Sequence, residues 1–335
     1  MKKAYIYPIS SRFHGQTHNP YLENFMDCLE DNFMFVNRNY PSKIGIFDIY
    51  RYIFNLQYIF FHWPEDMVER KFGFLQAAGF FLLILLCRIK KIRMVYVVHN
   101  KLSHARKNLT LKSMIAKSLA KHSKTITHSR EGVAFVENIS GKKADTFYFP
   151  HPVEPVSYIE TFKDIDILIW GNIAPYKGID EFLKMHHHAL ARKKWKITIA
   201  GRVSSNTYLA EMQALLTEDM EIINAFLDEK QLSQLINRSK IVLFPYHPDS
   251  VLSSGAFAKT LAYPVHILGP DCGAFADFKH FNNISVFTDR NNILIEAERI
   301  LQNGNINETV SLTEINRITK DYSWVSFKET LIKSL

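Results

Sequence analysis

Residues 166–178 read DILIWGNIAPYKG, and this stretch decides how the C-terminal half of the chain is interpreted. Its first five residues are typical of a buried strand, and Gly171 to Gly178 follow as a loop that opens a helix. Glycine lets a backbone approach a ligand closely, a helix N-terminus favours an anion, and Lys177 adds a positive charge. The stretch therefore predicts a phosphate-binding loop, with an ordinary polar turn as the alternative for the loop taken alone.

Two further loops of the C-terminal half share these features. The strand expected at Lys196–Ala200 is followed by Gly201 and Arg202, and Ser253-Ser254-Gly255 precedes a helix that begins near Ala256. The serines offer hydroxyls, and the helix offers backbone N–H groups, to another phosphate. Three phosphate-binding strand ends in one domain predict a diphosphate ligand.

Apolar runs of strand length alternate with segments of helical period along most of the chain, which predicts parallel α/β sheets. The expected strands are Ala4–Tyr7, Tyr58–Phe61, Met94–Val98, Thr125–Thr127, Asp166–Trp170, Lys196–Ala200, Glu221–Asn224, Ile241–Phe244 and Val265–Leu268. Single cores rarely exceed about 250–300 residues, so a chain of 335 residues favours two domains. Pro150, Pro152 and Pro155 predict a stiff crossing between them. We therefore expect two doubly wound α/β domains, at residues 1–152 and 160–320.

Histidines follow three of the expected strands in the N-terminal half. His62, His99 and His128 come directly after these strands, at residues 58–61, 94–98 and 125–127. Open parallel sheets bind ligands outside the carboxyl ends of their strands, so these positions are candidates for a site. A loop histidine with satisfied hydrogen bonds is the alternative for each one taken alone.

Charge is distributed unevenly along the chain. The net charge is +8, but residues 1–150 hold 22 basic and 11 acidic residues, whereas the remainder holds 19 basic and 22 acidic. No acidic residue lies between Lys71 and Arg130. Such a surplus predicts an anionic partner, either membrane phosphates or nucleic acid. No zinc-finger, RNP-like or helix-turn-helix motif accompanies the charge, so we expect an anionic membrane and no nucleic acid.

Two segments of this basic stretch have membrane-like character. Phe74–Cys87 lacks charge but is shorter than the about 20 residues of a spanning helix. It is therefore either a buried helix or one partly sunk in a bilayer interface. Leu109–Lys121 has apolar residues at helical spacing and three lysines, Lys112, Lys117 and Lys121, that no acid of the stretch balances. It predicts a basic amphipathic helix on anionic lipid, with an ordinary solvated helix as the alternative.

The cysteines and the N-terminus bear on location. Three cysteines without a CxxC pair do not form a disulfide framework or a zinc site of the usual spacing. The first residues have no apolar segment or cleavage pattern of a signal peptide. We expect a cytoplasmic protein, peripheral at the inner face of the plasma membrane.

The quoted residues resemble those of GT-B glycosyltransferases, in particular the family 4-like enzymes (glycosyl transferases group 1). Gly171–Gly178 is similar to that family's G-R-x-x-x-x-K-G element, and residues 226–245 are similar to a second family segment. Residues 249–265 occupy the place of its paired-glutamate donor motif. The resemblance implies two Rossmann-like, doubly wound domains that face each other across a cleft. It also implies that a final helix, residues 322–335, packs on the first domain.

The resemblance assigns roles to individual residues. The residues that would bind the donor are Gly171, Asn172, Lys177, Arg202, Ser253, Ser254 and Gly255. His99 takes the place of the family histidine beside the transferred sugar, and Asp249 takes that of the first glutamate. The chain departs from the family pattern at Asn172, which replaces an arginine, and at Phe257, which replaces the ribose-binding second glutamate. Ala262 stands in the place of a glycine.

The resemblance implies a metal-independent hexosyltransferase that retains the anomeric configuration and takes a nucleotide sugar as co-substrate, without another cofactor. The basic N-terminal half suggests a lipid-linked or membrane-proximal glycan acceptor, so we expect a role in surface polysaccharide biosynthesis. A catalytically inactive, membrane-peripheral nucleotide-sugar-binding protein is the alternative. His186-His187-His188 suggests a metal site, but consecutive helical residues point about 100° apart. We expect a solvated helix face there and no metal.

Overall fold

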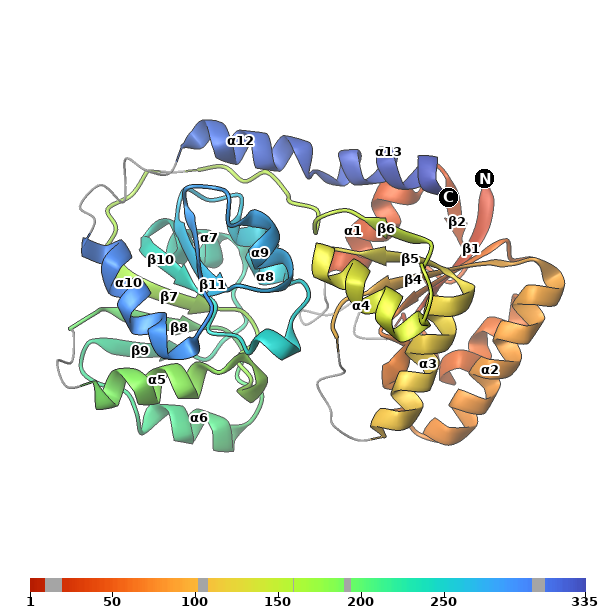
Figure 1. The fold of residues 1–335 in the computed structure, drawn as a ribbon, viewed down its shortest axis with the longest axis horizontal. Helices are drawn as coiled ribbons and strands as arrows, with labels where there is room; N and C mark the ends of the chain where they lie inside the picture. Colours follow the sequence, from red (N-terminus) through yellow and green to blue (C-terminus); the bar gives the residue numbers. More distant parts are fainter. Residues whose placement is uncertain (10–19, 102–107, 159, 190–193, 303–310) are drawn as a thin grey trace. The chain divides into compact units, whose positions relative to one another are not determined.

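The computed structural model describes residues 1–9, 20–101, 108–158, 160–189, 194–302 and 311–335 (Figure 1). These residues form two compact units. The N-terminal unit is Met1–Pro150 together with Trp324–Leu335, and the C-terminal unit is His151–Ser323. The chain passes from one unit to the other between Pro150 and His151, within the proline-rich segment singled out above.

The N-terminal unit is built on a six-stranded parallel sheet. Its strands are β1 (Lys2–Tyr7), β2 (Phe33–Phe35), β3 (Tyr58–His62), β4 (Arg93–Val98), β5 (Lys124–Thr127) and β6 (Thr146–Tyr148). Its helices are α1 (Pro20–Leu29), α2 (Gly73–Lys90), α3 (Leu109–His122), α4 (Arg130–Ser140) and α13 (Trp324–Ser334), with 3-10 helices η2 (Gly45–Arg51) and η3 (Pro64–Glu69). The order β2-β1-β3-β4-β5-β6 changes direction between β1 and β3. A doubly wound sheet binds ligands at the carboxyl ends of its strands beside such a switch point.

The C-terminal unit is a second six-stranded parallel sheet. Its strands are β7 (Ile165–Trp170), β8 (Ile197–Ala200), β9 (Met220–Ile223), β10 (Ser239–Leu243), β11 (His266–Pro270) and β12 (Ile284–Phe287). Its helices are α5 (Ile179–His188), α6 (Asn206–Gln213), α7 (Glu229–Asn237), α8 (Gly255–Thr260), α9 (Gly273–Phe278), α10 (Ile293–Gln302) and α12 (Leu312–Asp321), with 3-10 helices η4 (Pro175–Lys177), η5 (Pro248–Ser250) and η6 (Arg290–Asn292). The order β12-β11-β10-β7-β8-β9 is the Rossmann order, and its switch point lies between β7 and β10.

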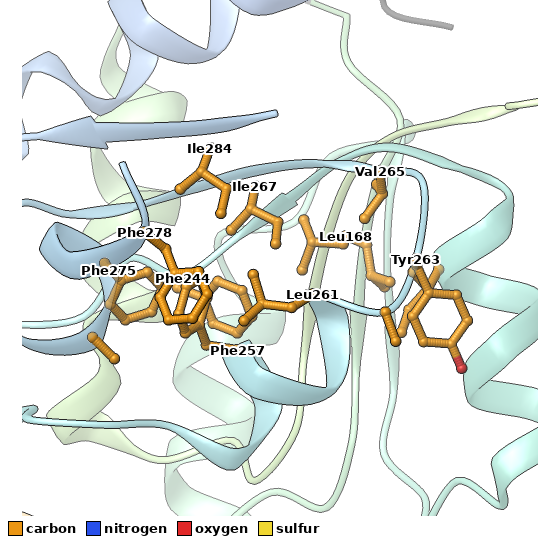
Figure 2. Close-up of a cluster of buried hydrophobic side chains, with 14 of the residues drawn as sticks. Leu168, Phe244, Phe257, Leu261, Tyr263, Val265, Ile267, Phe275, Phe278 and Ile284 are labelled. Carbon is orange, nitrogen blue, oxygen red and sulfur yellow. The ribbon is translucent and has the colours of Figure 1, made fainter. Parts of the chain in front are cut away.

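An aromatic core fixes α8 and α9 against the sheet of the C-terminal unit (Figure 2). The Phe257 and Phe275 rings lie 4.2 Å apart between centroids, and Phe244 and Phe278 contact the Phe257 ring. A side-chain hydrogen bond also ties α8 to the sheet: the Thr260 hydroxyl accepts from the Trp170 indole of β7 at 3.0 Å and donates to the Ala256 carbonyl within α8. Short α8 is therefore positioned by its packing rather than by its own helical stability.

The prediction of two doubly wound α/β domains is confirmed. Each expected strand is present, with ends shifted by two residues at most, whereas β2, β6 and β12 are not among the strands expected from the sequence. The expectation of a solvated face at residues 186–188 is wrong for His186, which is buried against the Phe182 and Trp195 rings. His187 and His188 are exposed as expected.

Candidate functional site

The switch point of the C-terminal sheet is formed by the residues that follow β7 and β10. Gly171 comes directly after β7, and its N–H donates to the carbonyl of Ala200 at 3.0 Å. Gly201 has a φ of +145°, and a Cβ there would lie 1.8 Å from the Gly171 carbonyl oxygen. Only glycine at position 201 lets these two strand ends approach each other this closely. Two of the predicted phosphate loops are therefore adjacent.

Lys177 lies at the end of η4, and its side chain extends back toward Gly171. Its Nζ is 3.4 Å from where a Cβ on Gly171 would be, and 5.1 Å from the centroid of the Tyr246 ring. Only 8% of the residue is exposed, and the Lys177 ammonium forms no hydrogen bond or ion pair with any residue that the structure describes. Burial lowers the pKa of its ammonium, against a smaller opposing effect of Tyr176. A buried cation without an anionic partner is costly, so the site favours an anion.

Tyr246 and Ser254 complete the wall around Lys177. The two hydroxyl oxygens lie 3.5 Å apart, and the Ser254 hydroxyl also accepts the N–H of Phe257 at 3.3 Å, which caps α8. Burial raises the pKa of Tyr246 to about 12, so this phenol is a neutral hydrogen-bond donor at physiological pH. Ala256 also faces this wall, since its Cβ is 3.6 Å from the same position on Gly171. The third predicted loop therefore lies beside the first.

His151 adds a neutral imidazole near the start of α8. Its Nε2 lies 3.7 Å from where a Cβ on Gly255 would be, and its Nδ1 lies 3.0 Å from the Pro152 carbonyl oxygen. Since a carbonyl only accepts, Nδ1 carries the proton and Nε2 is the acceptor nitrogen. Burial lowers the pKa of His151 to about 4. Sequence reasoning assigned His151 only to the proline-rich segment.

The other predicted donor residues are placed differently. The Asn172 side chain hydrogen-bonds to Tyr176, and Ser253 is partly exposed beside Ser254. The side chains of Arg202 and Asp249 are exposed and form no ion pair within the described residues. No ion pair among the described residues therefore holds either side chain in place.

Phe257 does not face this site. It is 1% exposed, and its ring is enclosed in the aromatic core of Figure 2. A glutamate side chain at the same position of α8 would enter that core, where an unpaired carboxylate is costly. The position that aligns with the second family glutamate is therefore a structural position in this chain.

A charged cluster that sequence reasoning missed fixes the loop after β10. Arg290 donates to the Gly178 carbonyl at 3.2 Å and to His247 Nδ1 at 2.6 Å, and it pairs with Glu181 at 3.0 Å. His247 Nε2 is 3.1 Å from the other Glu181 oxygen. Because Arg290 must donate, His247 Nδ1 is the acceptor and Nε2 carries the proton. The cluster joins the ends of η4, β10 and β12, and so it positions both Lys177 and Tyr246.

In the N-terminal unit, the three strand-end histidines gather around Tyr21 of α1. The Tyr21 ring centroid lies 5.8 Å from His62, 5.1 Å from His99 and 5.5 Å from His128. His62 Nδ1 and His99 Nε2 are 3.1 Å apart. This placement follows from topology, because β3, β4 and β5 are parallel neighbours whose carboxyl ends meet at one edge.

Hydrogen bonds set the proton positions in this cluster. His128 Nδ1 donates to the Phe149 carbonyl at 2.8 Å, so its Nε2 accepts the Tyr21 hydroxyl proton at 2.7 Å. His62 is fully buried, and burial lowers its pKa to about 3, with a smaller contribution from His128. His62 is therefore neutral, and its contact fixes the orientation of His99, the predicted catalytic residue. The Trp63 indole stacks on His99 at 4.0 Å between centroids.

The basic stretch of the N-terminal unit is partly neutralised by acids outside it. Lys112 is buried and pairs with Glu69 of η3, so the prediction that it belongs to an unbalanced basic face on anionic lipid is wrong for this lysine. Lys101 pairs with Glu131, and Lys124 pairs with Asp145. Arg106 and Lys107 lie outside the described residues. Lys117 and Lys121 of α3 are exposed, as are the basic residues that end α2.

Metal-binding and membrane-spanning features are sparse among the described residues. Among the described residues, no group of three or more histidine, cysteine or acidic side chains is arranged to hold a metal ion. By length and composition alone, α2 is the one described helix that is apolar enough to cross a membrane, and 44% of it is buried within the protein.

Comparisons with known proteins identify the fold. No protein-family model and no curated protein matches the chain. Among solved structures, HepE from Anabaena, described in complex with UDP and glucose, is similar over 100% of this chain and 99% of its own, with a TM-score of 0.73 and 9% identity. Sucrose-phosphate synthase from Thermosynechococcus elongatus is similar over 99% and 97% of the two chains, with a TM-score of 0.70 and 12% identity.

AviGT4, described as a glycosyltransferase of avilamycin A biosynthesis, is similar over 100% of this chain and 97% of its own, with a TM-score of 0.62 and 15% identity. These likenesses extend over both units. The chain therefore has the GT-B fold of glycosyltransferases, with two Rossmann-like domains, as the resemblance implied.

Proposed function

We propose that the protein is a glycosyltransferase that moves a hexose from a nucleoside-diphosphate sugar to a glycan acceptor. The observation that carries the proposal is Lys177, a buried cation without an anionic partner in the described residues, at the switch point of a Rossmann sheet. The GT-B fold and the description of HepE in complex with UDP-glucose also support it. UDP-glucose is therefore the first donor to test.

The chemistry assigned to these groups follows the charge of the reaction. The bond between the sugar C1 and the diphosphate oxygen breaks, an acceptor oxygen bonds to C1, and the acceptor hydroxyl proton passes to the departing diphosphate oxygen. Negative charge grows on the diphosphate, where Lys177 neutralises it and the Tyr246 and Ser254 hydroxyls donate hydrogen bonds. Groups that are already in position for this charge stabilise the transition state more than the ground state. Arg202 and the backbone near Gly255 would add further contacts.

Two predicted catalytic residues keep their roles in the proposal. His99 would contact the transferred sugar, and its contact with His62 fixes its orientation. Asp249 would stabilise positive charge on the sugar ring from the loop after β10. We propose retention of configuration and no catalytic metal, both on the resemblance to family 4-like enzymes. With Phe257 enclosed in the core, donor affinity would rest on the diphosphate more than on the ribose.

The acceptor is proposed to be lipid-linked or membrane-proximal, in surface polysaccharide assembly at the inner face of the plasma membrane. The basic surplus of residues 1–150 supports this part of the proposal. A catalytically inactive nucleotide-sugar-binding protein is the second candidate, favoured by the replacements at Asn172 and Phe257.

The test is release of nucleoside diphosphate from a panel of nucleotide sugars, with and without membrane extracts that supply acceptors. The matched variants are Lys177→Met, which keeps the aliphatic stem, and Lys184→Met, an exposed lysine of α5. An enzyme shows acceptor-dependent release that only Lys177→Met abolishes. Binding of a nucleotide sugar without release from any donor would favour the inactive protein.

A further inference from the structure

Helix α2 is apolar on two opposite faces. One face, which includes Phe80, Leu83 and Cys87, is buried in the N-terminal unit. On the other face a second apolar set is more than half exposed, and its members are Phe74, Leu75, Leu82, Leu85 and Ile89. A surface helix normally carries polar residues on its outer face. Packing inside the protein therefore explains only half of the apolar character of α2.

The exposed residues form one continuous stripe. Phe74, Ala78, Leu82, Leu85 and Ile89 follow each other at spacings of three or four residues, so they lie along one face of the helix. An 18-residue helix is about 27 Å long, and the stripe extends over most of that length. We call these five residues the outer stripe. Because the opposite face is packed against η2, η3 and α3, α2 cannot cross a bilayer without leaving its own domain.

Exposed cations lie at the C-terminal end of the outer stripe and on the neighbouring helix α3. Arg88 and Lys90 lie in the last turn of α2, Lys91 is its C-cap, and Lys117 and Lys121 are exposed on α3 (Figure 1). Neither α2 nor α3 contains an acidic residue. Exposed Phe54 lies under Lys90, whose Nζ is 4.2 Å from the ring centroid. An apolar strip with a cationic border matches the acyl chains and phosphates of an anionic bilayer interface.

We propose that the outer stripe of α2 inserts into the interface of an anionic membrane, with α2 lying parallel to the membrane plane. A second copy of the chain is a poorer occupant of this face. A symmetric dimer would bring the same surfaces together, and it would oppose the cations of α2 and α3 with no acid from either helix. Sequence periodicity favoured the segment at residues 109–121 for this role, but Lys112 and Ile115 of α3 are buried in the protein, so that set of residues does not form one exposed face.

This inference specifies the membrane contact of the proposed function, but it requires neither a donor nor catalysis. If the protein binds vesicles and transfers no sugar, the membrane surface stands and the enzyme proposal fails. If it transfers sugar and binds no vesicles, the enzyme proposal stands and the proposed membrane surface fails.

The experiment is co-sedimentation of the full chain with vesicles of phosphatidylcholine alone and of phosphatidylcholine mixed with phosphatidylglycerol. The test variant is Leu82→Glu/Leu85→Glu. The control is Ile295→Glu/Leu312→Glu, which makes the same charge change at exposed apolar residues of α10 and α12. We expect wild type and control to bind the mixed vesicles, and the α2 variant to partition at least about tenfold more weakly. Thermal melting checks that both variants fold.

A third variant tests the cationic border. Lys90→Gln/Lys91→Gln should weaken binding to mixed vesicles by about tenfold or more, since each basic residue near an anionic surface is worth roughly a factor of five. Equal binding by wild type and the α2 variant would overturn the proposal, as would equal losses in the α2 and control variants. A wild-type dimer that the α2 variant converts to monomer would also overturn it, because a second copy would then occupy the stripe.

Discussion

Replacing Lys177 with methionine should make the empty protein more stable and the enzyme inactive. An unpaired buried charge costs about 3–5 kcal/mol. The contact with the Tyr246 ring returns at most about 2 kcal/mol when desolvated. The difference predicts that Lys177→Met raises the free energy of unfolding by about 1–3 kcal/mol, since methionine fills the same space without the charge. Loss of the cation at the diphosphate should lower turnover by about 10²–10³-fold.

Urea unfolding without ligand measures the first effect, and release of nucleoside diphosphate measures the second. Lys184→Met is the control, because this exposed lysine pairs only with Asp180 on the same helix. That pair is worth about 0.5 kcal/mol, so the control should lose a little stability and no activity.

The pH dependence of the free energy of unfolding also distinguishes wild type from Lys177→Met. Burial lowers the pKa of Lys177 in the folded protein below its ordinary value of 10.5. At pH values between the folded and the unfolded pKa, the unfolded chain therefore binds more protons than the folded protein. Stability of wild type should therefore rise as pH increases toward 10.5, and Lys177→Met should lack that part of the rise. A variant that is less stable than wild type and still binds UDP would refute the reasoning, because Lys177 would then be a structural residue.

The His62 pKa is about 3 in the folded protein and about 6.5 unfolded, so its contribution to stability is complete above pH 6.5 and declines as pH falls toward 3. Urea unfolding at pH 7 and pH 5 should show a loss in wild type about 2 kcal/mol larger than in His62→Gln; equal losses would exclude a buried neutral His62. Gly201→Ala should cost at least about 3 kcal/mol of stability because its Cβ would overlap the Gly171 carbonyl, whereas Gly141→Ala, in open space at φ +69°, should cost about 1 kcal/mol. Similar melting temperatures for the two variants would contradict the close approach of the loops. Phe257→Ala should lower stability by about 3–5 kcal/mol and leave UDP affinity of the folded protein unchanged in calorimetry. Unchanged stability together with weaker UDP binding would place Phe257 at the nucleotide.

Much of the fold is predictable because the strands are buried on both faces. Runs such as Tyr58–Phe61 are continuous and apolar, which marks a central strand of a parallel sheet. Strand β2 has three residues and Met34 of it is exposed, so it lacks such a run. Strand β12 was missed for a related reason, since two of its four residues are only partly buried.

The site is predictable where it depends on strand ends and unpredictable where it depends on distant partners. Glycine-rich loops and histidines at the carboxyl ends of parallel strands must gather at one edge of each sheet. The burial of Lys177 depends on Tyr246 and α8, about 70–80 residues farther along the chain. The Arg290 contacts with His247 and Gly178 span 43 and 112 residues, and no local pattern encodes them.

Charge pairing shows the same limit. The acid-free stretch from Lys71 to Arg130 is a property of the sequence, but Lys112 finds Glu69 just outside it, and Lys101 finds Glu131. Conversely, the apolar run at residues 74–87 is compatible with full burial. Only the packing of α2 separates its buried face from the exposed outer stripe.

The central claim is that the loops around Lys177 bind the diphosphate of a nucleotide. The most direct test compares UDP with UMP by isothermal titration calorimetry in wild type and in Lys177→Met. The account predicts that wild type binds UDP at least about tenfold more tightly than UMP, and that Lys177→Met removes this difference. Equal affinity of wild type for the two nucleotides, or an unchanged preference for UDP in Lys177→Met, would contradict it.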